Sequence, residues 1–432
     1  MAEVRPFPGL RYRQPDLSDL LCPPYDVISP AEQRLLYERS PFNAVRLEYG
    51  ETSATDTPAD NRYTRAAATL RDWLASGVLS RDAAPAFYLH DQKFIHRGQT
   101  LTRRSLFARI RLQEWDEGSI RPHEHTLGAP KEDRLQLLRA CRVNISPILA
   151  LYRDAPGDVR RTLDEAQRRA SLLAEAQFEG GSHRLRAIDS PDAAQMLDRL
   201  FRNERLYVID GHHRYETALN YLKERRSQAP AWSGEEGENF ALLALVARDD
   251  PGLVVLPTHR LLKSVAAPPD FAARLAPAFQ LDDVSDAVAG VDAWPRIEVL
   301  LAAAGKRGIA LGVADSAGRR LILTTRDAEN VARLLPADKP ASWRSLDAAV
   351  LQHLVLSGIL GVGEGDDRVD FTHDGAEALS LVESGQCALA FFLNPTPTER
   401  VLDVADAAER LPQKSTYYYP KLPTGLVMNP LD

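Results

Sequence analysis

Cysteine is scarce in this sequence. Its 432 residues include 3 cysteines, Cys22, Cys141 and Cys387, which lie far apart and form no C-x-x-C pair. This scarcity argues against a disulfide framework and against a cysteine-based zinc site. Long apolar runs are lacking too: no stretch approaches the roughly 20 apolar residues that span a bilayer, and the start has no apolar signal-peptide core. We therefore expect a cytoplasmic protein with no membrane partner.

The common phosphate-loop, dinucleotide and hydrolase signatures are also missing. The sequence contains no G-x-x-x-x-G-K-[ST], no G-x-G-x-x-G after a predicted strand and no G-x-S-x-G. An excess of positive charge is absent as well, because 53 Lys and Arg face 60 Asp and Glu, a net charge of −7. Proteins that coat nucleic acid carry the opposite balance. We expect small anionic ligands, bound in a local basic pocket, and no nucleic acid.

What is present is an ordinary globular composition, with 44% hydrophobic and 26% charged residues. The patterns of apolar residues predict an α+β protein with a mixed sheet in a domain spanning residues 1–262 and a smaller α/β domain spanning residues 263–432. We predict helices over residues 30–39, 61–75, 158–174, 212–226 and 401–410, after Pro130 and after Ser190, and strands over residues 42–49, 86–94, 102–112, 148–152, 185–188, 206–209, 241–248, 253–256, 309–313, 320–325 and 387–394.

The sharpest cluster of functional side chains is Asp210-Gly211-His212-His213-Arg214, where a buried strand turns on a glycine into a helix. The start of a helix presents N–H groups and a positive dipole to an anion, and histidine and arginine side chains add donors suited to phosphate. Asp210 could hold Mg²⁺ or accept a hydroxyl proton. The alternative is that Asp210 only caps the helix and the histidines are polar surface.

A second cluster follows Arg121. In an extended segment, His123 and His125 point to one side and Glu124 to the other. Glu124 or His123 could transfer a proton, with Thr126, Lys131 and Arg134 near an anionic substrate. A zinc site on the two histidines lacks a third ligand at a recognisable spacing, and an exposed polar loop remains an alternative. The C-terminal Lys414-Ser415-Thr416 and Lys421 offer two ammonium groups and two hydroxyls for phosphate or carboxylate, or else the tyrosines between them anchor the chain end by packing. The two lysines lead us to expect that this tail folds back over the site.

Four motifs in order carry a resemblance to a known family. They are P-P-Y-D-V-I (residues 23–28), H-E-H-T (123–126), D-G-H-H-R-Y-E-T-A (210–218) and P-Q-K-S-T-Y-Y-Y-P-K (412–421). Together they resemble the bacterial and archaeal family called domain of unknown function 1015 over nearly the whole chain. That family carries no agreed activity.

The D-G-H-H-R element also resembles the phosphate-binding element of the ParB/sulfiredoxin-like superfamily, which includes the partition protein ParB, sulfiredoxins and free-serine kinases. This second resemblance implies phosphate contacts for Gly211, His213 and Arg214, with His212 adjacent. His212 stands where sulfiredoxin needs a thiol, and the sequence has no basic helix-turn-helix domain of the ParB kind. The serine-kinase branch is therefore the one that the sequence favours.

The resemblance implies a nucleotide-dependent kinase that phosphorylates the hydroxyl of a small metabolite such as L-serine, with Mg²⁺ and ATP or ADP as cofactors. We expect catalytic roles for Glu124, Asp210 and His212, phosphate or nucleotide binding by Gly211, His213 and Arg214, metal binding by Asp210, and substrate binding by His123, Thr126, Lys131, Arg134, Lys414, Ser415 and Thr416. The alternatives are a non-catalytic nucleotide or metabolite sensor and a phosphoester hydrolase.

Overall fold

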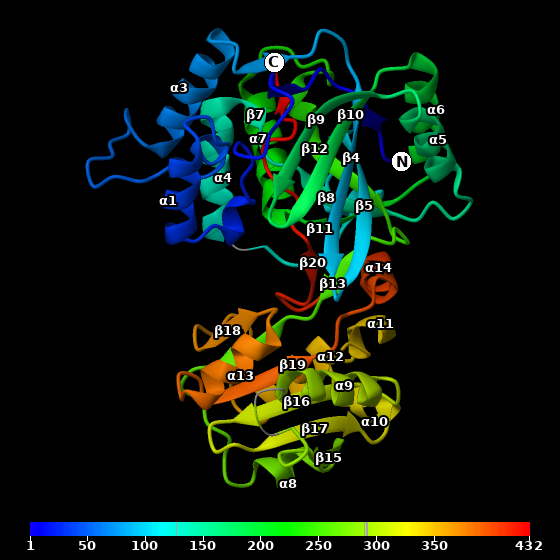
Figure 1. The fold of residues 1–432 in the computed structure, drawn as a ribbon. Coiled ribbons are helices and arrows are strands. Elements are labelled where there is room, and N and C mark those ends of the chain that lie inside the picture. Colours follow the sequence, from blue (N-terminus) through cyan, green and yellow to red (C-terminus); the bar gives the residue numbers. More distant parts are fainter. Residues whose placement is uncertain (127, 289, 291–292) are drawn as a thin grey trace. The chain divides into compact units, whose positions relative to one another are not determined.

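A computed structural model describes residues 1–126, 128–288, 290 and 293–432 (Figure 1). The chain divides into two units. Unit 1 comprises Met1–Pro122, Thr126–Val254 and Pro420–Asp432, and unit 2 comprises His123–His125 and Val255–Tyr419. The last segment of unit 1, Pro420–Asp432, is called the C-terminal strap below. The domain boundary at residue 262 stays a prediction, although the strand just before it hydrogen-bonds within the sheet of unit 2.

The main sheet of unit 1 is mixed, as the sequence predicts. Its strands follow the order β6-β11-β8-β12-β5-β4-β10-β9, with β1 added beside β5. The pairs β6–β11 and β8–β12 are parallel and the other pairs are antiparallel. The strands are β1 (Val4–Arg5), β4 (Phe87–His96), β5 (Gln99–Arg111), β6 (Ile120–Pro122), β8 (Ile148–Tyr152), β9 (Ser171–Phe178), β10 (Gly181–Ile188), β11 (Leu206–Asp210) and β12 (Phe240–Ala247).

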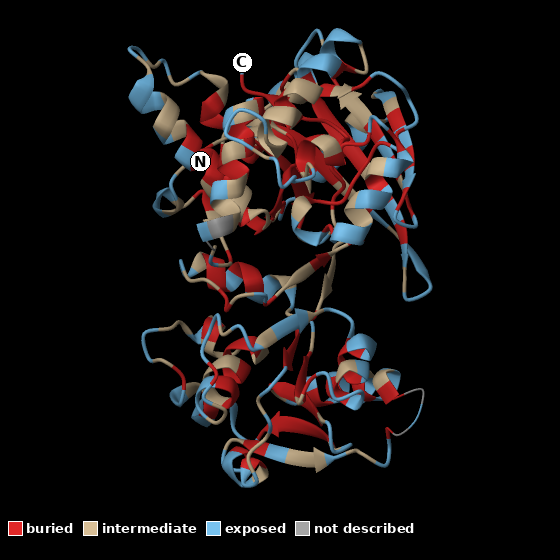
Figure 2. Cartoon of the chain, turned by 90° about the vertical axis from the view of Figure 1, so that its left-hand side faces the viewer, coloured by how far each residue is buried: buried red, intermediate tan, exposed pale blue. Residues whose placement is uncertain are grey.

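The remaining elements of unit 1 are helices and short strand pairs. They are β2 (Leu10–Tyr12), η1 (Tyr25–Val27), α1 (Pro30–Arg39), α2 (Val45–Glu48), α3 (Arg62–Ala75), β3 (Leu79–Arg81), η2 (Trp115–Glu117), α4 (Gly128–Cys141), β7 (Val143–Asn144), α5 (Asp158–Gln167), α6 (Pro191–Phe201), α7 (His212–Gln228), η3 (Gly237–Asn239) and β21 (Asn429–Pro430). Apolar residues of α5, α6 and α7 pack on one face of the main sheet and form the core of the unit (Figure 2). The C-terminal strap hydrogen-bonds to the strands at the opposite face, through Gln92 and Arg103.

Unit 2 is a second sheet between two helical layers. Its strands follow the order β15-β17-β16-β19-β14-β18 and pair antiparallel. One core lies between this sheet and α9 and α13, and another between the sheet and the remaining helices. The elements are β14 (His259–Leu262), α8 (Phe271–Leu275), β15 (Phe279–Asp283), α9 (Ala293–Gly305), β16 (Ala310–Asp315), β17 (Arg320–Thr325), α10 (Ala328–Arg333), α11 (Ala341–Arg344), α12 (Asp347–Val350), the π-helical η4 (Leu351–Ser357), β18 (Val369–Thr372), α13 (Gly375–Glu383), β19 (Leu389–Leu393), α14 (Thr398–Asp406) and β20 (Tyr417–Tyr419), and the chain passes from unit 1 to unit 2 in β13 (Val254–Leu256).

The strand predicted over residues 42–49 is wrong, because this segment contains helix α2. The Asn43 side chain accepts from Val45 N at 3.0 Å and donates to the carbonyl oxygens of Asp19 and Leu21. The bond to Val45 N is local, and local bonds of this kind between side chain and main chain compete with strand pairing. The apolar residues that suggested a strand, Val45 and Leu47, are instead buried from a helical turn.

The helix predicted over residues 158–174 is too long. Helix α5 ends at Gln167, and strand β9 begins at Ser171 and pairs with β10. The turn between these strands is Glu179-Gly180, and both residues have positive φ, 48° and 72°. Two such residues favour the turn that joins antiparallel strands, which the sequence signals weakly when the first residue is Glu rather than Asn or Asp.

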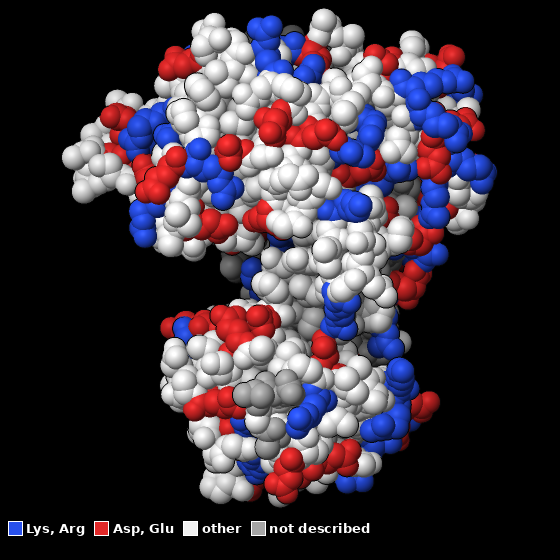
Figure 3. Space-filling view, in the orientation of Figure 1, with Lys and Arg blue, Asp and Glu red and all other residues white. Residues whose placement is uncertain are grey.

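Charges of both signs are dispersed over the face of the molecule that Figure 3 shows. In Figure 3 the Lys and Arg side chains lie among Asp and Glu side chains on the face shown, without a large area of one sign. Among the described residues, no helix combines the length and the apolar character that crossing a bilayer requires.

Candidate functional site

The turn from β11 into α7 is built on a glycine. Gly211 is the N-cap of α7 and has a φ of 88°, in the left-handed region that favours glycine. A Cβ at this position would lie 2.8 Å from Arg214 Nε, so the missing side chain also makes room for the Arg214 guanidinium. The first turn contains no acidic residue. Gly211 has no side chain to cap α7, and the nearby carboxylate of Asp210 precedes the cap and is paired with Arg214. The N–H groups of this helix start can therefore face an anion.

Asp210, the last residue of β11, is held by two cations. Its Oδ2 accepts from Arg214 Nη2 at 2.7 Å, and its Oδ1 accepts from Lys421 Nζ of the C-terminal strap. Burial alone would raise the pKa of Asp210, but the charges of Lys421 and Arg214 outweigh burial and hold the pKa well below its ordinary value. Asp210 is therefore ionised at neutral pH, and both of its oxygens are engaged.

The metal and base roles that the sequence suggested for Asp210 stay predictions, and both of its oxygens are engaged in this arrangement. A Mg²⁺ ion or a substrate proton would have to displace a cation from the carboxylate, and the low pKa makes the group a poor proton acceptor. Within the described residues, no group of three or more His, Cys, Asp and Glu side chains is arranged to hold a metal ion. Asp210 positions Arg214 and Lys421.

Arg103 of β5 is a third cation of this region. Its side chain is fully buried, and Nη2 donates to Gln92 Oε1 at 2.6 Å and to the carbonyl oxygen of Pro420 in the strap at 2.7 Å. Among the residues that the structure describes, Nε and Nη1 of Arg103 have no hydrogen-bond partner, and neither has Nε of Arg214. Burial lowers the pKa of Arg103 to about 10, so the guanidinium still carries its charge at neutral pH. Buried donors without partners are rare in native proteins and often mark the place of a water or an ion.

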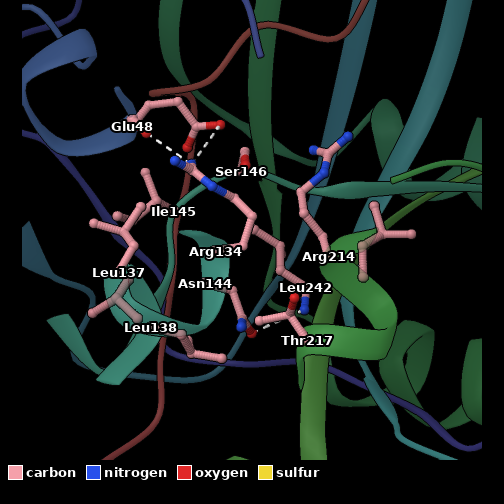
Figure 4. Close-up of a pocket in the computed structure, with 12 residues that line it drawn as sticks. Glu48, Arg134, Leu137, Leu138, Asn144, Ile145, Ser146, Arg214, Thr217 and Leu242 are labelled. Carbon is pink, nitrogen blue, oxygen red and sulfur yellow. Dashed lines mark hydrogen bonds and ion pairs between the residues drawn. The ribbon is translucent and has the colours of Figure 1, made fainter. Parts of the chain in front are cut away.

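A small cavity lies beside Arg214 (Figure 4). Arg134 lines it and donates from Nη1 to the carbonyl oxygen of Glu48 at 2.8 Å and from Nη2 to Asp133 at 2.5 Å. Its guanidinium also lies 4.1 Å from the ring centre of Tyr25, in the P-P-Y-D-V-I segment. The cavity volume is about 50 Å³, which holds a few water molecules and excludes a nucleoside. Arg134, which the sequence assigned to substrate binding, thus lines this cavity while its guanidinium is bonded to Glu48 and Asp133.

Thr126 and Lys131 meet at a different point. Thr126 Oγ1 donates to Glu216 Oε2 at 2.6 Å, and Lys131 Nζ donates to the same oxygen at 3.0 Å, while Trp115 Nε1 donates to Oε1 at 3.2 Å. Burial would raise the pKa of Glu216, but these hydrogen bonds outweigh it and lower the pKa. Thr126 and Lys131, both predicted to bind substrate, therefore connect α4 and the residues just before it to α7 through hydrogen bonds to Glu216.

The other predicted residues belong to unit 2. His123, which is buried, lies with Nε2 at 2.9 Å from Thr416 Oγ1. The Glu124 carboxylate accepts from the main-chain N of Lys414, and Ser415 Oγ donates to the carbonyl oxygen of Pro412 at 2.5 Å. The H-E-H segment therefore contacts the K-S-T segment, although Glu124 and Lys414 are 290 positions apart in the sequence.

Sequence reasoning anticipated the Asp210–Arg214 turn and missed Arg103, Glu48 and the position of Tyr25. The signal for Arg103 is weak, since arginine residues are mostly exposed and an arginine within a strand gives no sign of burial. Glu48 was hidden by the wrong strand prediction over residues 42–49. His212 is buried and His213 is half-buried at the start of α7. The charge of His212 makes a smaller contribution to the low pKa of Asp210 than the charges of Lys421 and Arg214 do.

The comparisons with known proteins find a family for the chain. The family model described as "Protein of unknown function (DUF1015)" matches residues 4–349. Among curated proteins there is no match. Among solved structures, a free serine kinase in complex with AMP has a TM-score of 0.36 at 13% identity, covering 74% of this chain and 92% of that one.

Two further solved structures are similar at the same level. A conserved hypothetical protein from Pyrococcus furiosus has a TM-score of 0.34 at 13% identity and covers 74% of this chain and 95% of that chain. SbnI with a C-terminal truncation, from Staphylococcus aureus, has a TM-score of 0.31 at 10% identity, over 70% and 81% of the two chains. At TM-scores this low the likenesses show nothing about chemistry. The match to the family model spans most of the sequence, and the chain belongs to the DUF1015 family.

Proposed function

We propose that this protein is a nucleotide-dependent kinase that phosphorylates the hydroxyl of a small metabolite such as L-serine, and that the start of α7 holds the nucleotide phosphates. The observation that carries the proposal is the set of donors around this helix end. Arg214, Lys421 and Arg103 bring three positive charges to one carboxylate, Asp210, and two of the three guanidinium or ammonium groups retain nitrogen atoms without a partner.

Phosphate fits this donor set better than a neutral ligand does. Main-chain N–H groups at a helix start favour an anion, and guanidinium groups match phosphate oxygens with paired donors. In the proposal, Gly211 keeps the turn open, and Arg214 and His213 contact phosphate. Lys421 would exchange its bond to Asp210 for a phosphate oxygen. Asp210 would stay ionised throughout and orient Arg214.

Phosphoryl transfer needs little covalent chemistry from the protein, and depends on positioning and on neutralising charge. The acceptor hydroxyl oxygen forms a bond to the transferred phosphorus, the bond from phosphorus to the leaving nucleotide oxygen breaks, and the hydroxyl proton passes to a base. From the sequence alone we assign the proton to Glu124, a residue of unit 2 whose carboxylate accepts from the main-chain N of Lys414. Mg²⁺ would accompany the nucleotide phosphates, as phosphoryl transfer commonly requires, with no ligand assigned to it on this chain.

Calorimetry with ATP and ADP tests the nucleotide part of the proposal. Arg214→Gln should weaken binding by about tenfold or more, because charge-assisted contacts to phosphate are the strong ones. Arg226→Gln provides the control, since Arg226 is an exposed arginine near the other end of the same helix. Equal affinity of Arg214→Gln and wild type would refute the phosphate role.

Turnover tests the assignment of Glu124. Glu124→Gln keeps the size of the side chain and can still accept the Lys414 N–H, but it cannot take a proton. We expect nucleotide affinity to stay within about twofold while the rate falls by about 10² or more. Normal turnover in Glu124→Gln would show that another group accepts the proton.

A non-catalytic nucleotide sensor is the second candidate. The saturation of Asp210 by Lys421 and Arg214 favours it, because a carboxylate so engaged binds and orients but takes no proton. A sensor would bind nucleotide, lose that binding in Arg214→Gln and form no product with any acceptor.

A further inference from the structure

A second cavity of unit 1 lies between α1, α2 and α3 and is unrelated to the turn at Asp210. It is lined by Tyr37, Arg46, Thr52, Ser53, Arg62 and Arg65, with Gly50, Glu51 and Thr69 completing the wall, and is called the Arg46 cavity here. Its volume is about 420 Å³, within the range of small-molecule sites. None of its lining residues belongs to the site described above.

Three guanidinium groups face this cavity, and two of them have carboxylate partners. Arg62 pairs with Asp133, and Arg65 lies 2.9 Å from both Asp56 and Asp60. These pairs lock Arg62 and Arg65 in place and compensate most of their charge. A ligand that enters meets donors whose directions are already set.

Arg46 differs because none of the described carboxylates pairs with it. Its Nη2 donates to the carbonyl oxygen of Tyr37 at 3.1 Å, and its guanidinium lies 4.2 Å from the centre of the Tyr37 ring. Its Nε is buried without a hydrogen-bond partner. The Arg46 charge is therefore uncompensated at the wall of the cavity, which favours an anionic ligand.

The rest of the wall indicates what the anion is attached to. Thr52, Ser53 and Thr69 offer hydroxyl groups, and the Gly50–Ser53 loop is fixed by bonds from Glu51 N to Tyr37 Oη at 3.0 Å and from Arg65 Nη2 to the carbonyl oxygen of Glu51 at 2.9 Å. The one aromatic ring, Tyr37, has a face covered by Arg46. Glu51 is the one acidic residue of the wall, against three arginines, so the balance of charge still favours an anion. A wall rich in hydroxyl and guanidinium groups suits a polyhydroxylated molecule rather than an apolar one.

We propose that the Arg46 cavity binds a phosphate monoester of a small polyhydroxylated metabolite, with Arg46 as the principal phosphate ligand. The site lies outside the proposed nucleotide site and goes beyond the proposed kinase activity. Arg62 and Arg65 supply further donors, and the hydroxyl groups of the loop contact the organic part.

Calorimetric titration with glucose 6-phosphate, inorganic phosphate and unphosphorylated glucose tests this site. Wild type should bind glucose 6-phosphate, bind phosphate more weakly and not bind glucose. Arg46→Gln should weaken glucose 6-phosphate binding by about tenfold or more, because it removes the uncompensated charge. Arg34→Gln is the matched control, an exposed arginine on α1, and should bind as wild type does.

Two more variants keep the test decisive. Thr52→Glu places a negative charge at an exposed position of the loop and should weaken binding without disturbing packing, even if Arg46→Gln proves unstable. Arg214→Gln should leave glucose 6-phosphate binding unchanged, which separates this site from the nucleotide site. The proposal is overturned if wild type binds neither phosphate compound, if Arg46→Gln and Thr52→Glu bind as wild type does, or if Arg214→Gln alone abolishes binding.

Discussion

At the scale of single residues, Gly211 shows how local geometry serves the proposed phosphate site. Its left-handed φ lets β11 turn sharply into α7, and its lack of a side chain lets the Arg214 guanidinium lie over the turn. The glycine thus has two separable roles, one for the backbone and one for Arg214. A matched pair of variants can tell them apart.

Gly211→Ala should lower the free energy of unfolding by about 1–2 kcal/mol, since alanine resists a positive φ, and should also displace Arg214. Gly98→Ala is the control, because Gly98 has a φ of 75° but no neighbouring group within 4 Å of the position that a Cβ would take. Urea unfolding should show similar losses for both, while calorimetry should show weaker nucleotide binding for Gly211→Ala alone. Equal nucleotide affinity in the two variants would contradict the role of Gly211 in placing Arg214.

A pair of buried histidines makes the stability of unit 1 depend on pH. His90 Nε2 lies 3.0 Å from His183 Nδ1, and the rings stack at 5.2 Å. Burial lowers the pKa of His183 to about 4, and it lowers the pKa of His90 too, with a smaller contribution from the His183 charge. Both rings are therefore neutral in the folded protein at pH 7.

Stability should fall as the pH drops from about 6.5 towards 4, because the unfolded chain binds protons in this window and the folded chain does not. For His183 alone the loss between pH 7 and pH 5 is roughly 1–2 kcal/mol. Urea unfolding at both pH values should show a smaller loss in His183→Gln than in wild type. His125→Gln, at an exposed position, should keep the full pH dependence, and a wild-type-like slope in His183→Gln would exclude this cause.

At the scale of elements, the C-terminal strap is part of the proposed site as well as part of the fold. Its main chain pairs with Leu10 through Met428 and with Cys22 through Thr424, and its apolar side chains are buried. It also supplies Lys421 to Asp210 and the Pro420 carbonyl oxygen to Arg103. Folding of unit 1 therefore brings the end of the chain to the start of α7.

Ending the chain at Tyr419 should abolish the cooperative unfolding of unit 1, because burial of Leu426, Val427 and Met428 is lost. Lys421→Met should leave the fold intact and weaken nucleotide binding by several-fold, since only the ammonium group is lost. Circular dichroism during urea unfolding and calorimetry measure the two effects. A truncated chain that unfolds like wild type would show that the strap is dispensable for the fold.

Local signals predicted elements well wherever they were strong. The helix predicted over residues 30–39 is confirmed as α1, and Ser29 caps it by accepting from Glu32 N at 3.2 Å. The strands predicted over residues 86–94 and 102–112 are confirmed as β4 and β5, which pair antiparallel around Arg97-Gly98, two residues with positive φ. The segment at residues 42–49 failed because its side chain to main chain bonds involve Asp19 and Leu21, which no local pattern reveals.

In the candidate site, too, features set by neighbouring residues could be predicted, and features set by distant residues could not. The Asp210–Arg214 turn could be predicted because its chemistry is contiguous in sequence. The sequence suggested a tail that returns to the site, but it did not identify Asp210 as the partner of Lys421, which is 211 positions away. Arg103 gave no signal, because it reaches the region by strand pairing and through the strap. Thr126 and Lys131 were assigned to a substrate from their residue types, whereas in the fold they contact Glu216.

At the scale of the whole molecule, the chain has a net negative charge but gathers arginine and lysine side chains at single sites such as the Asp210 turn. The net charge is −7, and the charges on the face of Figure 3 are interspersed. Attraction of anions is therefore local to places such as the Asp210 turn, which suits small phosphate compounds better than polyanions. The family model ends at residue 349. Lys421, which contacts Asp210 in the proposed site, lies outside the matched region.

Phosphorus NMR of the full chain with Mg²⁺, a nucleotide and a hydroxyl acceptor tests the central claim most directly. ATP, ADP and CTP would each be supplied with L-serine and with a pool of other hydroxyl metabolites. The proposed function predicts a new phosphoester signal that requires one nucleotide and one acceptor and disappears in Arg214→Gln. Nucleotide that stays unchanged with every acceptor, while calorimetry still shows it bound, would contradict the kinase and support the sensor.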